Sequence, residues 1–303
     1  MRLEQLLKHI EKEALSSNEE FKRLFHGRGG LYEGYRHLTV DSIDTIVSVA
    51  LYFEEPNEKE LIDMLKSFTC KAGYKTLVVQ RRYRKGTPSE IVIGEIPKSL
   101  HVIENGMKLK LNLLSNKNNG YFPDMKNGRS FVREHAKNRH VLNLFSYTCA
   151  FSVAAKLGGA KSVVNVDMSK SALKTGMANH SLNNLDPKGV SFLPYNILKS
   201  FSSLQRKGPY DLIIIDPPTF QRGSFEATKD YEKLIKKLPL IASKECILLA
   251  CLNSPELQSN FIIDMIKEHA PSFHFERRLE NPPEFASADE EKSLKNLLFK
   301  RIK

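Results

Sequence analysis

The sequence predicts an α/β protein in which a doubly wound, largely parallel sheet follows a smaller N-terminal α+β domain. From residue 139 onward, strand-like and helix-like segments alternate, and the strands are nearly continuous apolar runs. Such runs are typical of parallel strands that helices cover on both faces. The chain of 303 residues also exceeds the usual size of one domain. We therefore expect two domains, residues 1–104 and residues 105–303.

The first domain is predicted from local periodicity. Helical spacing predicts helices over residues 3–15, 18–25 and Glu58–Lys71. Apolar or alternating runs predict strands at Arg36–Val40, Thr45–Phe53, Thr76–Arg82 and Glu90–Ile96. The domain is expected to end near a hairpin-like turn, Glu104-Asn105-Gly106, which precedes the predicted strand Lys108–Leu114.

The second domain is predicted to contain five parallel strands and a terminal antiparallel pair. The five apolar strands are HVLNLF (140–145), SVVNVD (162–167), VSFLPY (190–195), YDLIIID (210–216) and ECILLAC (245–251). Helices separate them, including a long one predicted from Glu226, and another helix follows from Pro255. The runs Phe273–Glu280 and Leu294–Ile302 close the chain. This order predicts a Rossmann-like, seven-stranded sheet of the class I methyltransferase type, because a dinucleotide-binding fold continues with parallel units.

Composition indicates a globular protein, and the positive net charge favours a polyanionic partner. Apolar residues make up 41% and charged residues 27%, and no apolar run is long enough to cross a bilayer. Since the N-terminus also lacks a secretory apolar stretch, we expect a cytoplasmic protein without a membrane partner. The net charge of +11 favours a partner such as RNA. The four cysteines form no C-x-x-C pair, so neither a metal site nor a disulfide framework is predicted.

A cofactor site is predicted beyond the carboxyl ends of the first two strands of the second domain. The first strand continues into Asn143-Leu144-Phe145-Ser146-Tyr147-Thr148, and the second ends in Asp167 (167 − 143 = 24 residues after Asn143). An acid there can accept hydrogen bonds from ribose hydroxyls, although it is also a common solvated strand end. Ser169 is a plausible N-cap of the next helix. The loop has no G-x-G-x-x-G for a pyrophosphate, which favours S-adenosylmethionine over a nicotinamide cofactor.

The fourth strand leads into a loop of unusual stiffness. Asp216-Pro217-Pro218-Thr219-Phe220 follows the buried run Leu212–Ile215. Two prolines fix the backbone, so Asp216 and the carbonyl of Pro217 are expected to be held rigidly at the sheet edge. Phe220 can offer a face on which a nucleobase stacks. We expect this loop to carry the catalytic residues.

The chain resembles the family of ribosomal RNA large-subunit methyltransferases that includes 5-methylcytosine and 7-methylguanine enzymes. The resemblance extends over roughly residues 25 to 303, and the first domain looks like the family's central RNA-binding domain. It is densest in GYFPDMKNGR (120–129), VLNLFSYTCAFSVAA (141–155), VVNVDMSKSAL (163–173) and YDLIIIDPPTF (210–220).

The resemblance implies a set of cofactor contacts. Asp124 and Arg129 would lie near the cofactor, Asp167 would hold the ribose, and Asn196 stands where the family usually has an acid beside the adenine. Glycines are more common in the family where Cys149 and Ala150 stand. Phe145, Ser146 and Thr148 would line the methionine end. The full set of expected cofactor contacts is Asp124, Arg129, Asn143, Phe145, Ser146, Tyr147, Thr148, Asp167, Met168, Ser169, Asn196, Ile197 and Asp216.

Two acceptor atoms remain open in the sequence. Methylation of cytosine at carbon 5 requires a cysteine thiolate that first adds to carbon 6. The resemblance implies that Asn253, and not Cys251, stands at the thiol position of the family. The sequence is therefore closer to the 7-methylguanine branch, whose ring nitrogen needs positioning alone. We favour a ring nitrogen, with carbon 5 through Cys251 as the alternative, and expect catalytic roles for Asp216, Pro217, Pro218, Phe220 and Asn253.

Ribosomal RNA is the expected partner, and two segments combine positive charge with aromatic rings. One is Arg28–Arg36, and the other contains Arg81, Arg82, Tyr83, Arg84 and Lys85 at a probable hairpin tip. Arginine binds phosphate and tyrosine stacks on unpaired bases, but a hairpin tip is charged in many proteins. Two other functions stay open: a non-catalytic RNA-binding or assembly factor, and methylation of a protein or metabolite. The sequence makes no prediction of the oligomeric state.

Overall fold

The computed structural model describes residues 3–15, 19–114, 118–221 and 225–302, without the side chains of residues 220 and 221. The chain divides into two compact units, one of Met1–Pro123 with Pro282–Glu290 and one of Asp124–Asn281 with Glu291–Lys303. The division after Pro123 differs from the expected one at residue 104. Residues beyond 104 stay with the first unit because Tyr121 donates a hydrogen bond to the Glu104 carboxylate (2.5 Å) and packs its ring on Phe21.

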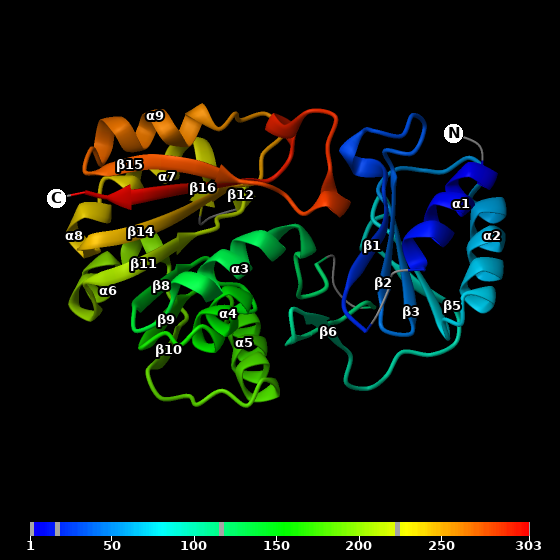
Figure 1. Cartoon of the computed structure of the whole chain (residues 1–303), viewed down its shortest axis with the longest axis horizontal. Coiled ribbons are helices and arrows are strands. Elements are labelled where there is room, and N and C mark those ends of the chain that lie inside the picture. Colours follow the sequence, from blue (N-terminus) through cyan, green and yellow to red (C-terminus); the bar gives the residue numbers. More distant parts are fainter. Residues whose placement is uncertain (1–2, 16–18, 115–117, 222–224, 303) are drawn as a thin grey trace. The chain divides into compact units, whose positions relative to one another are not determined.

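The first unit is a five-stranded sheet covered by two helices (Figure 1). The strands occur in the order β1-β2-β3-β4-β5, and only β3 and β4 are parallel. Leu6 and Ile10 of one helix and Leu65 of the other are buried in the same core as the strands, which accounts for their helical spacing. The bounds are α1 (Leu3–Ala14), β1 (Lys22–His26), β2 (Leu38–Ile43), β3 (Ile46–Leu51), α2 (Glu58–Lys71), β4 (Thr76–Arg81) and β5 (Ser89–Ile93). A separate hairpin, β6 (His101–Glu104) and β7 (Met107–Lys110), follows with its turn at the predicted Asn105-Gly106.

One predicted helix of the first unit is wrong. Residues 22–26, within the helix expected over 18–25, form strand β1, and residues 16–18 lie outside the described part of the chain. β1 pairs antiparallel with β2, and the Arg23 guanidinium forms an ion pair with Asp41 of that strand. Leu24 and Phe25 are buried against the sheet. This long-range pairing outweighs a weak local preference for helix.

The second unit contains the predicted seven-stranded sheet. The strand order is β10-β9-β8-β11-β14-β16-β15, in which the first five strands are parallel and β16 is antiparallel to both of its neighbours. The prediction of a Rossmann-like class I sheet is thus confirmed. The strands are β8 (His140–Leu144), β9 (Ser162–Val166), β10 (Val190–Leu193), β11 (Tyr210–Ile215), β14 (Ala242–Leu252), β15 (Phe273–Leu279) and β16 (Lys295–Arg301).

Helices cover both faces of this sheet. One face is covered by α3 and α4, and the other by α6 to α9. The long helix predicted from Glu226 is divided into α7 and α8, because Pro239 cannot continue a helix and lies in the first turn of α8. The bounds are α3 (Lys126–His135), α4 (Ala150–Leu157), α5 (Lys170–Leu182), α6 (Phe201–Lys207), α7 (Ala227–Ile235), α8 (Leu238–Ile241) and α9 (Asn260–His269).

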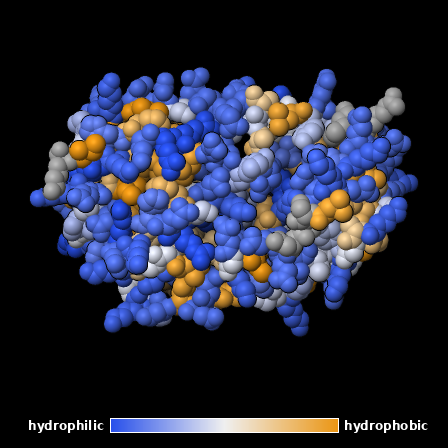
Figure 2. All heavy atoms as spheres, in the orientation of Figure 1, coloured by the Kyte–Doolittle hydropathy of each residue, from blue (hydrophilic) through white to orange (hydrophobic). Residues whose placement is uncertain are grey.

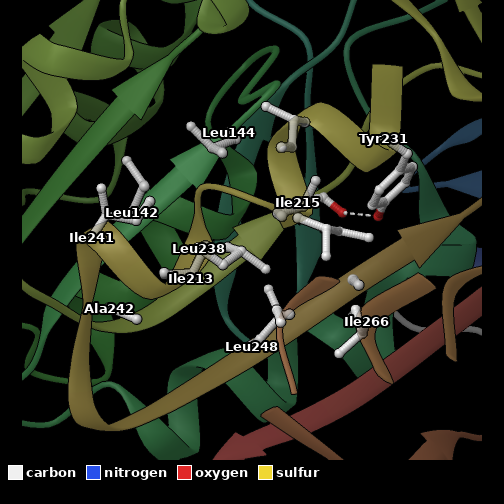
Figure 3. Packing of buried hydrophobic residues seen from close by; sticks show 14 of the residues in the cluster. Leu142, Leu144, Ile213, Ile215, Tyr231, Leu238, Ile241, Ala242, Leu248 and Ile266 are labelled. Atoms are coloured by element: carbon white, nitrogen blue, oxygen red, sulfur yellow. Dashed lines mark hydrogen bonds between the residues drawn. The ribbon is translucent and has the colours of Figure 1, made fainter. Parts of the chain in front are cut away.

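The larger core cluster fixes the ends of two central strands. Ile213 and Ile215 of β11 and Leu248 of β14 pack with the side chains of α7 to α9 (Figure 3). The buried Tyr231 hydroxyl of α7 lies 3.4 Å from the Ile215 carbonyl and 3.1 Å from the Cys251 carbonyl. One helix therefore holds the carboxyl ends of β11 and β14, where the predicted catalytic residues begin.

The surface is mainly polar. Figure 2 shows a largely hydrophilic face on which hydrophobic residues form small, separate groups. Among the described residues, no helix has the length and apolar character that a bilayer crossing requires. In the same part of the chain, no cluster of three or more His, Cys, Asp or Glu side chains is placed to bind a metal.

Candidate functional site

Most predicted cofactor residues lie at the carboxyl edge of the parallel strands of the second unit. Ligands of doubly wound sheets bind outside this edge, where neighbouring strands have helices on opposite faces. A pocket there is lined by Phe145, Asp167, Met168, Asn196, Ile197, Leu198 and Phe225. Five of the seven were predicted from the sequence. Leu198, directly after the predicted Ile197, and Phe225 were missed. Phe225 has no local sequence signal, because only the fold brings the β13 strand (Phe225–Glu226) to this edge.

The loop after β8 has a strained backbone. Phe145, Tyr147 and Cys149 have φ values of 58°, 44° and 61°, a left-handed conformation that residues other than glycine rarely adopt. Hydrogen bonds hold this cofactor loop (residues 145–149) in place. The Asn179 amide of α5 donates to the Thr148 carbonyl (2.9 Å). The Ser146 backbone N–H donates to the carbonyl of Val166, the last residue of β9 (3.1 Å). The surroundings thus impose the shape of the loop.

Asp167 organises the cofactor loop as well as lining the pocket. One carboxylate oxygen accepts the Tyr147 backbone N–H (2.9 Å), and the other accepts the Ser169 backbone N–H (2.8 Å). A carboxylate oxygen can accept more than one hydrogen bond, so these contacts are compatible with ribose binding. Ser169 caps α5 as predicted, because its hydroxyl accepts the Ala172 N–H (3.2 Å). Sequence reasoning identified Asp167 but not its role in shaping the loop.

Asn143 lies behind the loop and not among the residues that line the pocket. Its side-chain amide donates to Asn165 (3.0 Å), which in turn donates to the Ser152 hydroxyl (2.9 Å). Ser152 is within hydrogen-bond distance of the His180 ring (3.0 Å). All four residues are buried. This network joins β8, β9, α4 and α5 beneath the cofactor loop, so a supporting role fits Asn143 better than direct contact.

Asn196 places a polar side chain among the mainly apolar residues that line the pocket. Its side-chain oxygen accepts the Lys199 backbone N–H (3.2 Å) and so caps a short 3-10 helix, Ile197–Lys199. An acid would make the same cap. Ile197 is buried, and Phe145 packs edge-on against Phe225 with ring centroids 4.9 Å apart. Apolar side chains beside one polar group form a suitable wall for a flat, partly polar ring.

Three charged residues that were predicted separately influence one another. Asp216 directly follows β11, Asp124 lies just before α3, and the buried Arg129 is on α3. Burial and the negative charge of Asp124 raise the pKa of Asp216 to about 7, and the positive charge of Arg129 partly opposes them. Two acids and a guanidinium together complement a group that carries both an ammonium and a carboxylate.

The predicted catalytic loop (residues 216–220) is hydrogen-bonded to the loop that follows β14. The Thr219 hydroxyl donates to the Asn253 backbone carbonyl (2.7 Å), and the Thr219 carbonyl accepts the Ala227 N–H (3.0 Å). Pro217 is buried, whereas Pro218 and the Asn253 residue are exposed. Phe220 opens β12 (Phe220–Gln221), but its side chain lies outside the described residues. The two loops thus form one polar, solvent-accessible edge.

Cys251 is unsuited to act as a nucleophile in this structure. Its side chain is fully buried in a core cluster. Burial, followed by the negative charges of Asp216 and Asp124, raises the pKa of the Cys251 thiol well above its usual range. The thiolate, which is the reactive form, is therefore strongly disfavoured.

The structure divides the predicted RNA-binding residues into two groups. Arg81 forms ion pairs with Glu58 (2.6 Å) and Glu90 (2.8 Å), and the Tyr83 hydroxyl donates to Glu58 (3.0 Å). These two residues fasten the β4–β5 hairpin to α2, which argues against a direct role in RNA binding.

One of the remaining basic residues of the hairpin, Arg82, shares an aromatic ring with Arg28. The Arg82 and Arg28 guanidiniums lie 5.0 and 3.9 Å from the centre of the Tyr52 ring. Arg84 and Lys85 are exposed at the hairpin tip. Because Arg28 is far away in the sequence, only the fold joins the two predicted basic segments. We call Arg28, Arg82, Arg84 and Lys85 the basic patch.

The strand order and the pocket at its carboxyl edge define a class I methyltransferase. A profile of S-adenosylmethionine-dependent methyltransferases matches residues 22–300, and the chain belongs to this family. S-adenosylmethionine is its cofactor. A crystal structure of a protein assigned as a methyltransferase, in complex with SAH, covers 99% of this chain and 82% of its own, with 26% identity and a TM-score of 0.87. A structure from Streptococcus mutans has the same coverage and TM-score with 25% identity.

Curated relatives are named for an RNA substrate. Ribosomal RNA large subunit methyltransferase K/L of Shewanella sp. strain MR-4 is 34% identical over 249 residues, which are 78% of this chain and 35% of the relative. A Bacillus subtilis protein assigned as a ribosomal RNA large subunit methyltransferase is 32% identical over 246 residues, 77% of this chain and 60% of that protein. The chain thus spans about a third of the first relative and three-fifths of the second.

Proposed function

We propose that this methyltransferase methylates a ring nitrogen of a base in large-subunit ribosomal RNA. The observation that supports the choice of atom is the complete burial of the Cys251 thiol, whereas the nearby edge where Thr219 binds the Asn253 carbonyl is exposed. Names of the relatives support an RNA substrate, and the basic patch supports a polyanionic partner. The cofactor supplies an electrophilic methyl group, which a ring nitrogen with an in-plane lone pair accepts without losing a proton.

The residues of the site fit S-adenosylmethionine. The pocket between Phe145 and Ile197 suits the adenine, and the Asp167 carboxylate suits the ribose hydroxyls. Asp124 and Asp216 would hold the ammonium of the methionine end, while Arg129 would hold its carboxylate. Asp216 and the two prolines after it would place the base in line with the methyl group, which is the main contribution a protein can make to such a transfer.

A cysteine substitution tests the acceptor atom. With Cys251→Ala we expect methyl transfer to an unmodified large-subunit RNA transcript to stay within about threefold of the parent, because a nitrogen acceptor needs no thiol. Mass spectrometry of the digested RNA identifies the product nucleoside. Cys246→Ala is a matched control, since it removes another buried thiol from β14. Trapping of the parent on 5-fluorocytosine RNA as an adduct that survives denaturation would establish the carbon 5 alternative.

We also propose that the basic patch binds RNA phosphates. Its members Arg82, Arg84 and Lys85 lie on or beside the β4–β5 connection, while Arg28 reaches the same Tyr52 ring from the η1 turn (Gly27–Gly29). Guanidiniums on an aromatic ring keep their edges available for hydrogen bonds to phosphate. Phe53, next to that ring in the sequence, is 63% exposed and offers a stacking surface for an unpaired base.

Charge removal from the patch tests this role. For Arg82→Gln/Arg84→Gln/Lys85→Gln we expect weaker RNA binding and a salt slope lower by roughly 0.7–0.9 for each phosphate that the variant no longer binds. The matched control, Lys59→Gln/Lys71→Gln/Lys75→Gln, removes the same net charge from exposed lysines of the same unit. Filter binding across a salt series gives both quantities. Equal slopes for the two triple variants would assign the effect to net charge and not to the patch.

A further inference from the structure

Lys295, the first residue of β16, is a fully buried cation that binds backbone carbonyls. Its ammonium donates to the carbonyls of Ser254 (2.9 Å), Ser293 (3.0 Å) and Glu291 (2.5 Å). An ammonium has three N–H donors, and these three acceptors can satisfy them all. Because a buried charge destabilises a protein unless it is well compensated, this arrangement is tolerated only while the three carbonyls stay in place.

Glu291 holds the same part of the chain at a second point. Its carboxylate accepts the Ser259 backbone N–H (2.6 Å) and the Ser259 hydroxyl (2.9 Å), and it pairs with Arg278 of β15 (3.0 Å). Burial raises the pKa of Glu291, but the Ser259 hydrogen bonds and the charges of Arg278 and Lys295 outweigh it, so the pKa lies below its usual value. The carboxylate is thus stabilised in its ionised form.

The two contacts fall at either end of one segment, residues 253–259, which we call the acceptor loop. It runs from Asn253, whose carbonyl is bound by Thr219 of the catalytic loop, to Ser259, directly before α9. These seven described residues form no helix or strand of their own. Besides the packing of Leu257 on the core, the loop is held by hydrogen bonds at Ser254 and Ser259, which come from the side chains of Lys295 and Glu291.

We propose that Lys295 and Glu291 are positioning residues that set the acceptor loop against the catalytic loop. Neither belongs to the residues that line the pocket or to the cofactor loop, so they act on the step that places the acceptor base and not on cofactor binding. This inference rests on the proposed function in one respect, the role of the exposed loop around Asn253 in binding the acceptor base. It explains why a lysine is buried at the start of β16, where an apolar residue would be expected.

The test combines kinetics with a measurement that needs no acceptor. Lys295→Met keeps a long, unbranched side chain and removes its charge. In this variant we expect faster amide hydrogen exchange in residues 253–259 and unchanged exchange in residues 145–149. We expect kcat to fall about tenfold or more at saturating cofactor. Affinity for S-adenosylhomocysteine, measured by calorimetry, should stay within about twofold of the parent. Glu291→Gln should show the same pattern with a smaller loss, and Lys295→Arg should recover part of the activity.

Leu297→Ala is the matched control, because it creates a cavity at another fully buried position of β16. It should lower Tm without a selective increase in the amide hydrogen exchange of the acceptor loop. Unchanged exchange of residues 253–259 in Lys295→Met would overturn the proposal whatever the substrate is, and so would a parallel loss of S-adenosylhomocysteine affinity. If the parent enzyme leaves ribosomal RNA unmethylated while the exchange result holds, the proposed substrate fails and the positioning role stands.

Discussion

Gly176→Ala is expected to lower the affinity for S-adenosylhomocysteine by about tenfold or more, because the added methyl group displaces the cofactor loop. A Cβ at position 176 would lie 2.4 Å from the Cys149 sulfur and 2.9 Å from the Cys149 Cβ. These atoms cannot move freely, since Cys149 is buried in a left-handed conformation directly before α4. Overpacking of this kind costs about 1–3 kcal/mol of stability, and here the strain falls on a binding loop.

A second-site change makes this result specific. Cys149→Gly removes both clashing atoms and provides the residue that best tolerates a φ of 61°. The double variant Gly176→Ala/Cys149→Gly should therefore recover most of the affinity, and the interaction between the two sites appears as non-additivity in a double-mutant cycle. Calorimetric titration of all four proteins measures it. Additive effects would mean that the contact between α5 and the loop does not govern cofactor binding.

The fold was predictable where sequence signals are local. The apolar strands Val141–Leu144 and Leu212–Ile215 are buried on both faces of the sheet, so a parallel sheet covered by helices followed from their alternation with helices. Strand β1 was not predictable, because its pairing with β2 and the Arg23–Asp41 ion pair join positions that local periodicity treats separately. Pro282–Glu290 belongs to the first unit for a similar reason: Phe285 packs against Arg23 and His26.

Sequence reasoning located residues of the candidate site but not the contacts that they make. Motif positions at the ends of predicted strands indicated Asp167 and Asp216, and the resemblance to the methyltransferase family indicated Asn253. The sequence contains no sign that Asp167 also accepts hydrogen bonds from two backbone amides, or that Arg81 forms ion pairs with Glu58 and Glu90. Gly176 and Lys295 were missed altogether. Their importance comes from contacts with Cys149 and with the acceptor loop, which lie far away along the chain.

Asp216→Asn is expected to change activity and stability in opposite directions. In the proposed function the ionised carboxylate accepts hydrogen bonds from the cofactor ammonium or the base, so the substitution should lower kcat/KM at pH 8 by about tenfold or more. In the parent, kcat/KM should rise with pH and level off above the Asp216 pKa of about 7, because it reports the ionisation of the free enzyme. The variant should lack this rise. Asp211→Asn, on the same strand at its other end, is the matched control and should keep it.

The pH dependence of protein stability tests the Asp216 charge independently of activity. The folded-state pKa of about 7 lies above the ordinary value of 3.8, so the folded protein holds this proton more tightly than the unfolded chain does. Ionisation of Asp216 therefore destabilises the cofactor-free fold progressively between these two values, and the full cost is present above pH 7. Asp216→Asn removes that charge and should raise Tm at pH 8, with the gain shrinking as the pH falls toward 4. A variant that is less stable than the parent at pH 8 would show that the Asp216 carboxylate supports the fold. A variant that keeps the pH dependence of kcat/KM would show that Asp216 is not the group whose ionisation serves the reaction.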